Sequence, residues 1–261
     1  MGEAAEAGEP LWWARRLSFL RGFARHRHLF DPRTEIPAAQ LLGMYGRRRT
    51  PHIYSTAEVS ALLRAAAALP PKEGLRPQTY VTLLGLLAST GMRISEALHL
   101  TRADVDLAAG MLMVARTKFR KSRLVPLHAS TVEALRRYAR RRDHHHRRPL
   151  SFAFFLNDRG GELGGSGVSN TFGILRRELG WTNGPDGHRP RIHDLRHTMA
   201  VRRLLRWYEE LVDVHRKIAA LATYLGHVEV TDTYWYLTAV RELLAIVSNR
   251  FEIFAAHRST P

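Results

Sequence analysis

The 261-residue chain contains no cysteine. This absence excludes disulfide bonds, zinc sites with cysteine ligands and a cysteine nucleophile. The chain also lacks an apolar run long enough to span a bilayer, and its first ten residues, MGEAAEAGEP, lack the basic-then-apolar order of a secretory signal. We therefore expect a protein with no membrane partner, placed in the cytoplasm or on the bacterial nucleoid.

Negative charge is scarce as well. Twenty-four Asp and Glu face 40 Lys and Arg, which gives a formal net charge of +16. Such a surplus fits a polyanionic partner, because each cation near a phosphate releases condensed counterions. Ribosomal, membrane-surface and chromatin proteins share this property, so charge alone does not single out double-stranded DNA. With 45% apolar residues, the chain can bury a sizeable core in one large domain or two small ones.

The expected secondary structure changes near residue 55. Residues 11–30 predict one amphipathic helix, and residues 31–52 contain several prolines and a basic run, which is typical of an extended linker. Ser55 followed by Glu58 forms a capping box that predicts a helix from about Thr56. We therefore place the domain boundary between residues 54 and 55, giving segments 1–54 and 55–261.

The second segment is mainly α-helical, with one β-rich interruption. Short β-prone runs at 111–116 and 123–127 flank a polar turn and predict a β-hairpin. Helical patterns are expected at 80–87, after Gly91, and at 130–142, 168–179, 194–207, 209–225 and 238–248. The predicted fold class is mainly α with a small β-hairpin or three-stranded sheet.

Four short strings contain most of the residues that could take part in a chemical reaction. They are Thr90–Leu98 (TGMRISEAL), Thr117–Arg123 (TKFRKSR), His193–His197 (HDLRH), and Leu225–His227 (LGH) with Tyr236 nine residues further on. Arginines in such a set suit phosphodiester chemistry, because a planar guanidinium binds two oxygens and keeps its charge while negative charge develops. A tyrosine hydroxyl can then attack phosphorus and form a covalent intermediate.

Together and in this order, the strings resemble the tyrosine recombinase or phage integrase family over about residues 55–250. The resemblance implies a tyrosine recombinase catalytic-domain fold and a phosphotyrosyl reaction without metal or ATP. It also implies a role for each matching residue: nucleophile Tyr236, phosphate-binding Arg93 and Arg196, general acid Lys118, proton-transfer partner His193 and phosphate donor His227.

Several of these positions have competitors. Tyr234 lies two residues from Tyr236, but the step from His227 favours Tyr236. Lys121 competes with Lys118 for the acid role, and Arg93 could merely pair with Glu96 on one helix face. We expect basic residues of the hairpin and of the linker to contact the DNA backbone: Lys121, Arg123, Arg47, Arg48 and Arg49.

The resemblance also implies partners and a setting. Recombination would use double-stranded DNA and four protomers, either a homo-tetramer or partner recombinases, in DNA integration or transposition of a mobile element. The chain departs from the family where only one convincing helix precedes residue 55, so segment 1–54 is interpreted as a partial core-binding domain of a shortened member. Two alternatives stay open: a type IB topoisomerase-like strand transferase, and a non-catalytic DNA-binding remnant of a recombinase.

The charge surplus generates a first prediction. DNA affinity should fall steeply with salt, since contact with six to ten phosphates costs about 10³–10⁵ in affinity between about 50 and 200 mM salt. A filter-binding titration at several salt concentrations measures this slope. A flat response would contradict DNA as the partner.

Overall fold

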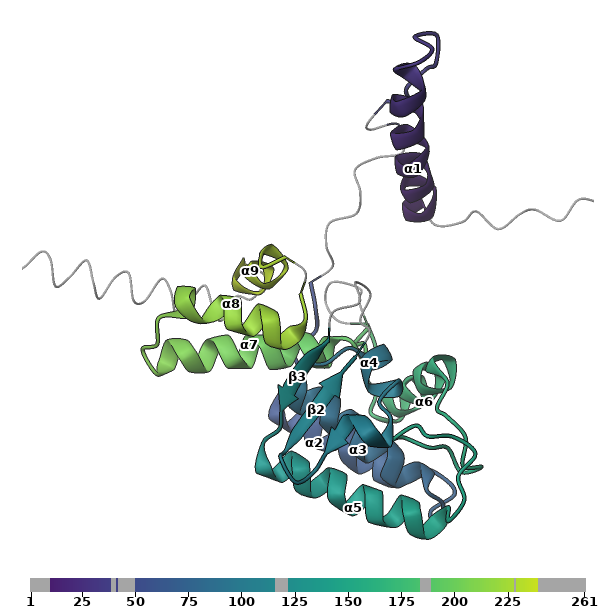
Figure 1. Cartoon of the computed structure of the whole chain (residues 1–261), viewed down its shortest axis with the longest axis vertical. Helices are drawn as coiled ribbons and strands as arrows, with labels where there is room; N and C mark the ends of the chain where they lie inside the picture. Colours follow the sequence, from purple (N-terminus) through teal and green to yellow (C-terminus); the bar gives the residue numbers. More distant parts are fainter. Residues whose placement is uncertain are drawn as a thin grey trace, which may run out of the picture. The chain divides into compact units, whose positions relative to one another are not determined.

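The computed structural model describes residues 10–38, 41, 50–115, 122–183, 189–227 and 229–238. The chain separates into two compact units, residues 1–50 and 51–261. In Figure 1, a long helix dominates the first unit, and the second unit combines helices with a small sheet. The second unit carries every string that the sequence singled out, apart from the arginine run in the linker.

The described elements follow one another as helices interrupted by a single sheet. The helices are α1 (Pro10–His28), α2 (Thr56–Ala67), α3 (Arg76–Thr90), α4 (Ile94–Leu98), the 3₁₀ helix η1 (Arg102–Asp104), α5 (Ala129–His145), α6 (Gly165–Glu178), α7 (Asp194–Glu209), α8 (Val214–Leu225) and α9 (Thr231–Thr238). The strands are β1 (Val105–Asp106), β2 (Met111–Val114) and β3 (Arg123–Pro126). This is the mainly α fold with a small sheet that the sequence predicts.

The capping box predicted at Ser55 is present at the start of α2. The Ser55 hydroxyl accepts a hydrogen bond from the Glu58 amide at 3.1 Å, and the Glu58 carboxylate accepts one from the Ser55 amide at 2.6 Å. Both contacts satisfy amides that the first turn of a helix leaves without intrahelical partners. The predicted start of this helix is confirmed.

The sheet has strand order β1-β2-β3, and both pairings are antiparallel. The predicted hairpin is confirmed by the β2–β3 register, which pairs Leu112 with Val125 and Val114 with Arg123. Leu112, Val114 and Val125 are buried, whereas Met113 and Leu124 on the opposite face are exposed. This alternation follows from the two-residue period of a strand with one face on the core.

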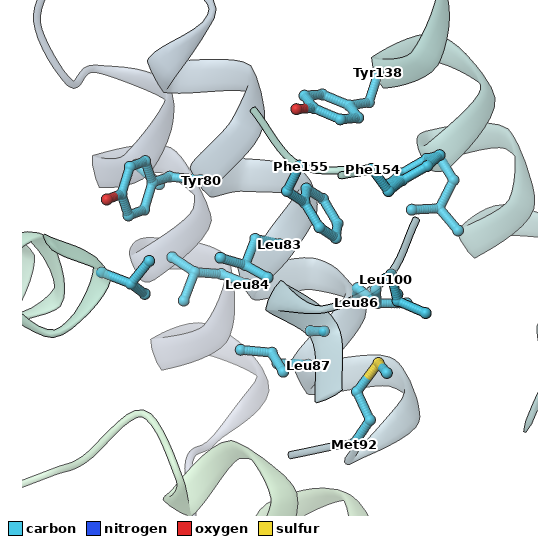
Figure 2. Close-up of a cluster of buried hydrophobic side chains, with 14 of the residues drawn as sticks. Tyr80, Leu83, Leu84, Leu86, Leu87, Met92, Leu100, Tyr138, Phe154 and Phe155 are labelled. Atoms are coloured by element: carbon cyan, nitrogen blue, oxygen red, sulfur yellow. The ribbon is translucent and has the colours of Figure 1, made fainter. Parts of the chain in front are cut away.

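A first core lies around α3, the most buried helix. Leu83, Leu84, Leu86 and Leu87 of this helix are at most 2% exposed. Figure 2 shows them packed with Tyr80 of the same helix and with apolar side chains from later helices and loops: Met92, Leu100, Tyr138, Phe154 and Phe155. The short apolar run around Phe154 and Phe155 is thus an extended core segment. Because α3 ends at Gly91, this core fixes the position of Arg93.

A second, smaller core joins α7, α8 and α9, which lie close together in Figure 1. It contains Val201, Leu204, Leu221, Leu225 and Tyr236. Helix α8 begins at Val214, later than the sequence predicts, because Asp213 caps it with a side-chain contact to the Arg216 amide. Helix α9 was not predicted, and the helix expected at 238–248 lies outside the described residues apart from its first residue.

The first unit is described by itself. Ala14 and Ala24 of α1 are buried, while Phe19, Leu20 and Phe23 are more than half exposed, so the expected apolar face is not covered within this unit. Arg21 ties the helix to the chain that follows it through hydrogen bonds to the carbonyls of Pro37 and Ala38. Among the helices in the described ranges, none has the length and apolar character needed to cross a membrane.

Candidate active site

The C-terminal end of α8 binds the side chains of three arginines that come from three distant segments. Its last carbonyls, on Tyr224, Leu225 and Gly226, accept hydrogen bonds of 2.9, 2.8 and 3.0 Å from Arg123, Arg196 and Arg93 respectively. The final carbonyls of a helix have no intrahelical partner and form the negative end of its dipole. The end of α8 therefore provides an anchoring point for cationic side chains.

Gly226 makes this arrangement possible. It takes the left-handed conformation, φ +70°, and ends α8. A side chain at this position would lie 2.5 Å from a terminal nitrogen of Arg123. A residue without Cβ is thus required both by the backbone conformation and by the close approach of Arg123.

Arg93 lies at the start of α4, where Glu96 holds it. The guanidinium donates to Glu96 Oε1 at 2.9 Å, and the Glu96 carboxylate also accepts the Arg93 amide at 2.9 Å. The Arg93 side chain remains 37% exposed, whereas that of Glu96 is 7% exposed. The predicted pair between these residues exists, but it leaves much of Arg93 accessible to solvent and hence to a phosphate.

Glu96 has a second arginine partner. Arg123 donates to its two carboxylate oxygens at 3.1 and 2.8 Å, a bidentate pair in which the Arg123 side chain is 10% exposed. Burial alone would raise the pKa of Glu96, but hydrogen bonds from Arg123 and from the Arg93 amide hold this pKa below its usual value. Glu96 is therefore ionised at neutral pH.

Arg196 is the most buried of the three arginines and is 3% exposed. It donates to the carbonyls of Gly91 at 2.8 Å and Leu225 at 2.8 Å, and it hydrogen-bonds to the hydroxyl of Tyr236. Burial lowers the pKa of Arg196 to about 10, although the nearby Tyr236 counteracts this effect. Arg196 thus stays positively charged at neutral pH and contacts the candidate nucleophile directly.

Three histidine rings surround this contact. His197 lies edge-on to both His193 and Tyr236, with ring centroids 4.9 and 5.4 Å apart. His227 stacks against Tyr236 at 6.0 Å, and its Nδ1 lies 2.7 Å from the Thr233 hydroxyl, which orients the ring. Burial, followed by the charge of Arg196, holds the pKa of His193 below its usual value, so this ring is neutral at pH 7.

The start of α7 is fixed by contacts to the segment that enters the unit. The Tyr54 amide donates to the Thr198 hydroxyl and its phenol donates to the Arg191 carbonyl, both at 2.9 Å. Asp194 is 1% exposed and accepts the Arg191 amide at 2.8 Å. These contacts on either side of His193 and Arg196 restrict how the first turn of α7 can move.

The structure brings five of the sequence-predicted residues together. Arg93, His193, Arg196, His227 and Tyr236 all surround the end of α8 and the Tyr236 ring. Tyr236 is 2% exposed and Tyr234 is 40% exposed. Of the two tyrosines, it is Tyr236 that contacts the arginine and histidine groups.

The remaining predicted residues are those expected to act as the acid or to contact DNA. Lys118, Lys121 and the run Arg47–Arg49 lie outside the described residues, so their roles stay predictions. Arg123, expected to contact the DNA backbone, is instead directed at Glu96 and the Tyr224 carbonyl. Its contacts in this structure are those of a side chain that holds other protein groups.

Sequence reasoning missed three participants: Glu96 as a shared partner of two arginines, His197 and Thr233. The spacing of Glu96 from Arg93 was visible, but a local pair was the only role it suggested. No sequence signal linked Glu96 to Arg123, since the two residues are 27 positions apart and come into contact only when β3 folds beside α4.

Comparisons with known proteins show the family and the fold of this chain. The sequence pattern of the phage integrase family matches residues 54–242. The chain is 44% identical over 94% of its length to y4rB of Sinorhizobium fredii, named as an integrase/recombinase, and covers 79% of that protein. It is 33% identical over 76% of its length to the tyrosine recombinase XerD of Mycobacterium tuberculosis, of which it covers 61%.

The fold also matches solved structures. The Tn1549 transposon integrase, in complex with a circular intermediate DNA, superposes with a TM-score of 0.63 at 16% identity, over 93% of this chain and 84% of that one. At this identity the likeness concerns the fold. With the sequence matches, it shows that this chain belongs to the phage integrase family, the tyrosine recombinases.

The left-handed turn generates a second prediction. Gly226→Ala should destabilise the protein by about 2 kcal/mol, because a left-handed alanine costs about 1–2 kcal/mol and the new Cβ displaces Arg123. Urea unfolding measures the change in the free energy of unfolding.

Gly173 provides the matched control. It lies inside α6, where a new Cβ meets no atom within 4 Å. Gly173→Ala should therefore stabilise the protein by about 0.5–1 kcal/mol through the lower entropy of the unfolded chain. Equal effects of both substitutions would contradict a special requirement at Gly226.

Proposed function

We propose that this protein cleaves and rejoins double-stranded DNA at specific sites through a covalent 3′-phosphotyrosyl intermediate on Tyr236. One observation carries the proposal: the Tyr236 hydroxyl hydrogen-bonds to Arg196 at the point where Arg93 and His227 also converge. In this proposal, a phosphate bound by the two arginines lies beside the Tyr236 hydroxyl. Membership in the phage integrase family supports the same chemistry.

The first step is attack of the Tyr236 hydroxyl oxygen on phosphorus. A new bond forms between them, the bond from phosphorus to the 5′ oxygen breaks, and the strand is left with a free 5′ hydroxyl. The tyrosine proton passes to His193, which is neutral because its pKa is depressed. Arg93, Arg196 and His227 stabilise the charge that develops on the non-bridging oxygens.

The leaving 5′ oxygen needs a proton. In this proposal Lys118 supplies it, and takes it back when the 5′ hydroxyl of another strand attacks the phosphotyrosine in the reverse reaction. Because the phosphotyrosyl bond conserves the energy of the broken phosphodiester, rejoining requires no nucleotide cofactor. The cationic side chains take the place of metal ions in neutralising the phosphate.

The broader role is integration or transposition of a mobile element, with four protomers on two duplexes. The relative y4rB is named as an integrase/recombinase, and the structurally similar Tn1549 protein is a transposon integrase bound to DNA. The protomers are copies of this chain or include partner recombinases. Residues 1–54 act in this proposal as a partial core-binding segment, in which Arg47, Arg48 and Arg49 contact the DNA backbone, and the Lys121 side chain does so from the hairpin.

Tyr236→Phe tests the nucleophile. Phe keeps the ring stacked on His227 but removes the attacking oxygen, so the covalent adduct should disappear while DNA affinity changes little. The assay is a substrate nicked beside the cleavage site, in EDTA, with the adduct read on a denaturing gel. Partner recombinases and DNA ends of the element are supplied.

Tyr234→Phe is the matched control, since it makes the same chemical change two residues away on an exposed side chain. It should leave the adduct unchanged. An adduct that survives Tyr236→Phe but is lost in Tyr234→Phe would show that the nucleophile is misassigned. No wild-type adduct under these conditions would favour a non-catalytic DNA-binding protein, and supercoil relaxation by a monomer would favour the topoisomerase alternative.

Lys118→Ala tests the acid. Cleavage of normal DNA should slow by about 10²–10⁴-fold, the usual contribution of a general acid. A substrate with sulfur in place of the bridging 5′ oxygen should restore the rate, because a thiolate leaves without a proton. Rescue of Lys121→Ala instead of Lys118→Ala would transfer the acid role to Lys121.

A further inference from the structure

Glu96 presents an electrostatic problem that the proposed chemistry does not explain. Its carboxylate lies 2.9 Å from Arg93, one of the two arginines assigned to the phosphate. A carboxylate paired with Arg93 alone would cancel the charge that this arginine offers to a phosphate and would compete for its donors. Something else must take up the charge of Glu96 if Arg93 is to act on DNA.

Arg123 has the geometry for this task. Its guanidinium occupies both oxygens of Glu96 at 3.1 and 2.8 Å, while the Arg93 guanidinium reaches only Oε1 and the Arg93 backbone amide donates to Oε2. Bidentate pairs of this kind are the strongest arginine–carboxylate contacts, and this one is largely buried, so water screens it little. The carboxylate is thus satisfied mainly by Arg123, and the 37% exposed side chain of Arg93 keeps its positive charge.

Arg123 also connects the sheet to the end of α8. Its Nε donates to the Tyr224 carbonyl at 2.9 Å, and the carbonyls of the next two residues hold Arg196 and Arg93. A single side chain on β3 therefore contacts the partner of Arg93 and the helix end that anchors both phosphate-binding arginines. Losing it would disturb both contacts of Arg93 together.

We propose that Arg123 is a positioning residue of the strand-transfer reaction, which neutralises Glu96 and so leaves Arg93 available to the scissile phosphate. This proposal rests on the function proposed above and replaces the direct contact with DNA that the sequence suggested for Arg123. It predicts that the defect of an Arg123 variant arises from the uncompensated carboxylate. If Arg123 merely supported the fold, the defect of its variants would not depend on whether the Glu96 carboxylate is present.

The test is a double-mutant cycle on the nicked-substrate assay with Arg123→Gln, Glu96→Gln and the double variant. Arg123→Gln should slow adduct formation by about 100-fold, the scale expected when a catalytic group is misplaced by about 1 Å. Adding Glu96→Gln removes the carboxylate that captures Arg93, so the double variant should be at least about tenfold faster than Arg123→Gln. A double variant as slow as the single one, or slower, would overturn the proposal.

Arg123→Lys keeps the charge without the bidentate geometry. It should cleave within about tenfold of wild type, and a rate as low as that of Arg123→Gln would contradict charge neutralisation. This variant also keeps the test informative if Arg123→Gln folds poorly. Arg216→Gln is the control for loss of one charge, because it breaks an exposed ion pair with Asp213 at the other end of α8 and should leave the rate unchanged.

DNA affinity separates positioning from direct contact. The slope of log affinity against log salt should be the same for Arg123→Gln and wild type, whereas loss of one phosphate contact lowers it by about 1. A lowered slope would assign Arg123 to the DNA backbone and overturn the proposal. Absence of any wild-type adduct would instead refute the proposed function, which is a separate result.

Discussion

The end of α8 is the contact on which the rest of the site depends. Two guanidinium groups bound to neighbouring carbonyls at one helix end repel each other by about 3 kcal/mol at an effective dielectric constant of about 20. The carbonyls of Tyr224, Leu225 and Gly226 offset this repulsion, since they present the negative end of the α8 dipole to three arginines. The protein thus assembles a strongly positive site in the absence of a phosphate.

This constraint explains the arrangement of the second unit. The arginines come from the start of α4, from β3 and from α7, so the site closes only when both cores are formed. The first core fixes the end of α3 and hence Arg93, while the second core packs α7, α8 and α9 so that Arg196 reaches Leu225. The geometry of the candidate site therefore depends on long-range packing and not on any single motif.

Short-range sequence patterns made part of the fold and of the site predictable. The capping box at Ser55, the β-hairpin and the order of the four strings could be read from the sequence, because each depends on residues a few positions apart. The α9 helix escaped prediction because Thr231–Thr238 is short and rich in β-branched and aromatic residues, which have modest helix propensity, so packing on α7 and α8 stabilises it. The contacts of Arg123 escaped prediction too, since Glu96 and Tyr224 approach it only in the folded chain.

In the proposed reaction, the charges in the site match a transition state better than bound DNA. Three arginines and one ionised carboxylate leave two positive charges at the end of α8, whereas a phosphodiester carries one negative charge and would gain more as Tyr236 attacked. Interactions that strengthen as charge develops lower the barrier, whereas those equal in both states only tighten binding. Because the arginines are already held by α8 carbonyls, little reorganisation accompanies the reaction. Glu96 contributes to this preorganisation, because it accepts hydrogen bonds from both Arg93 and Arg123 and so holds the two side chains close together.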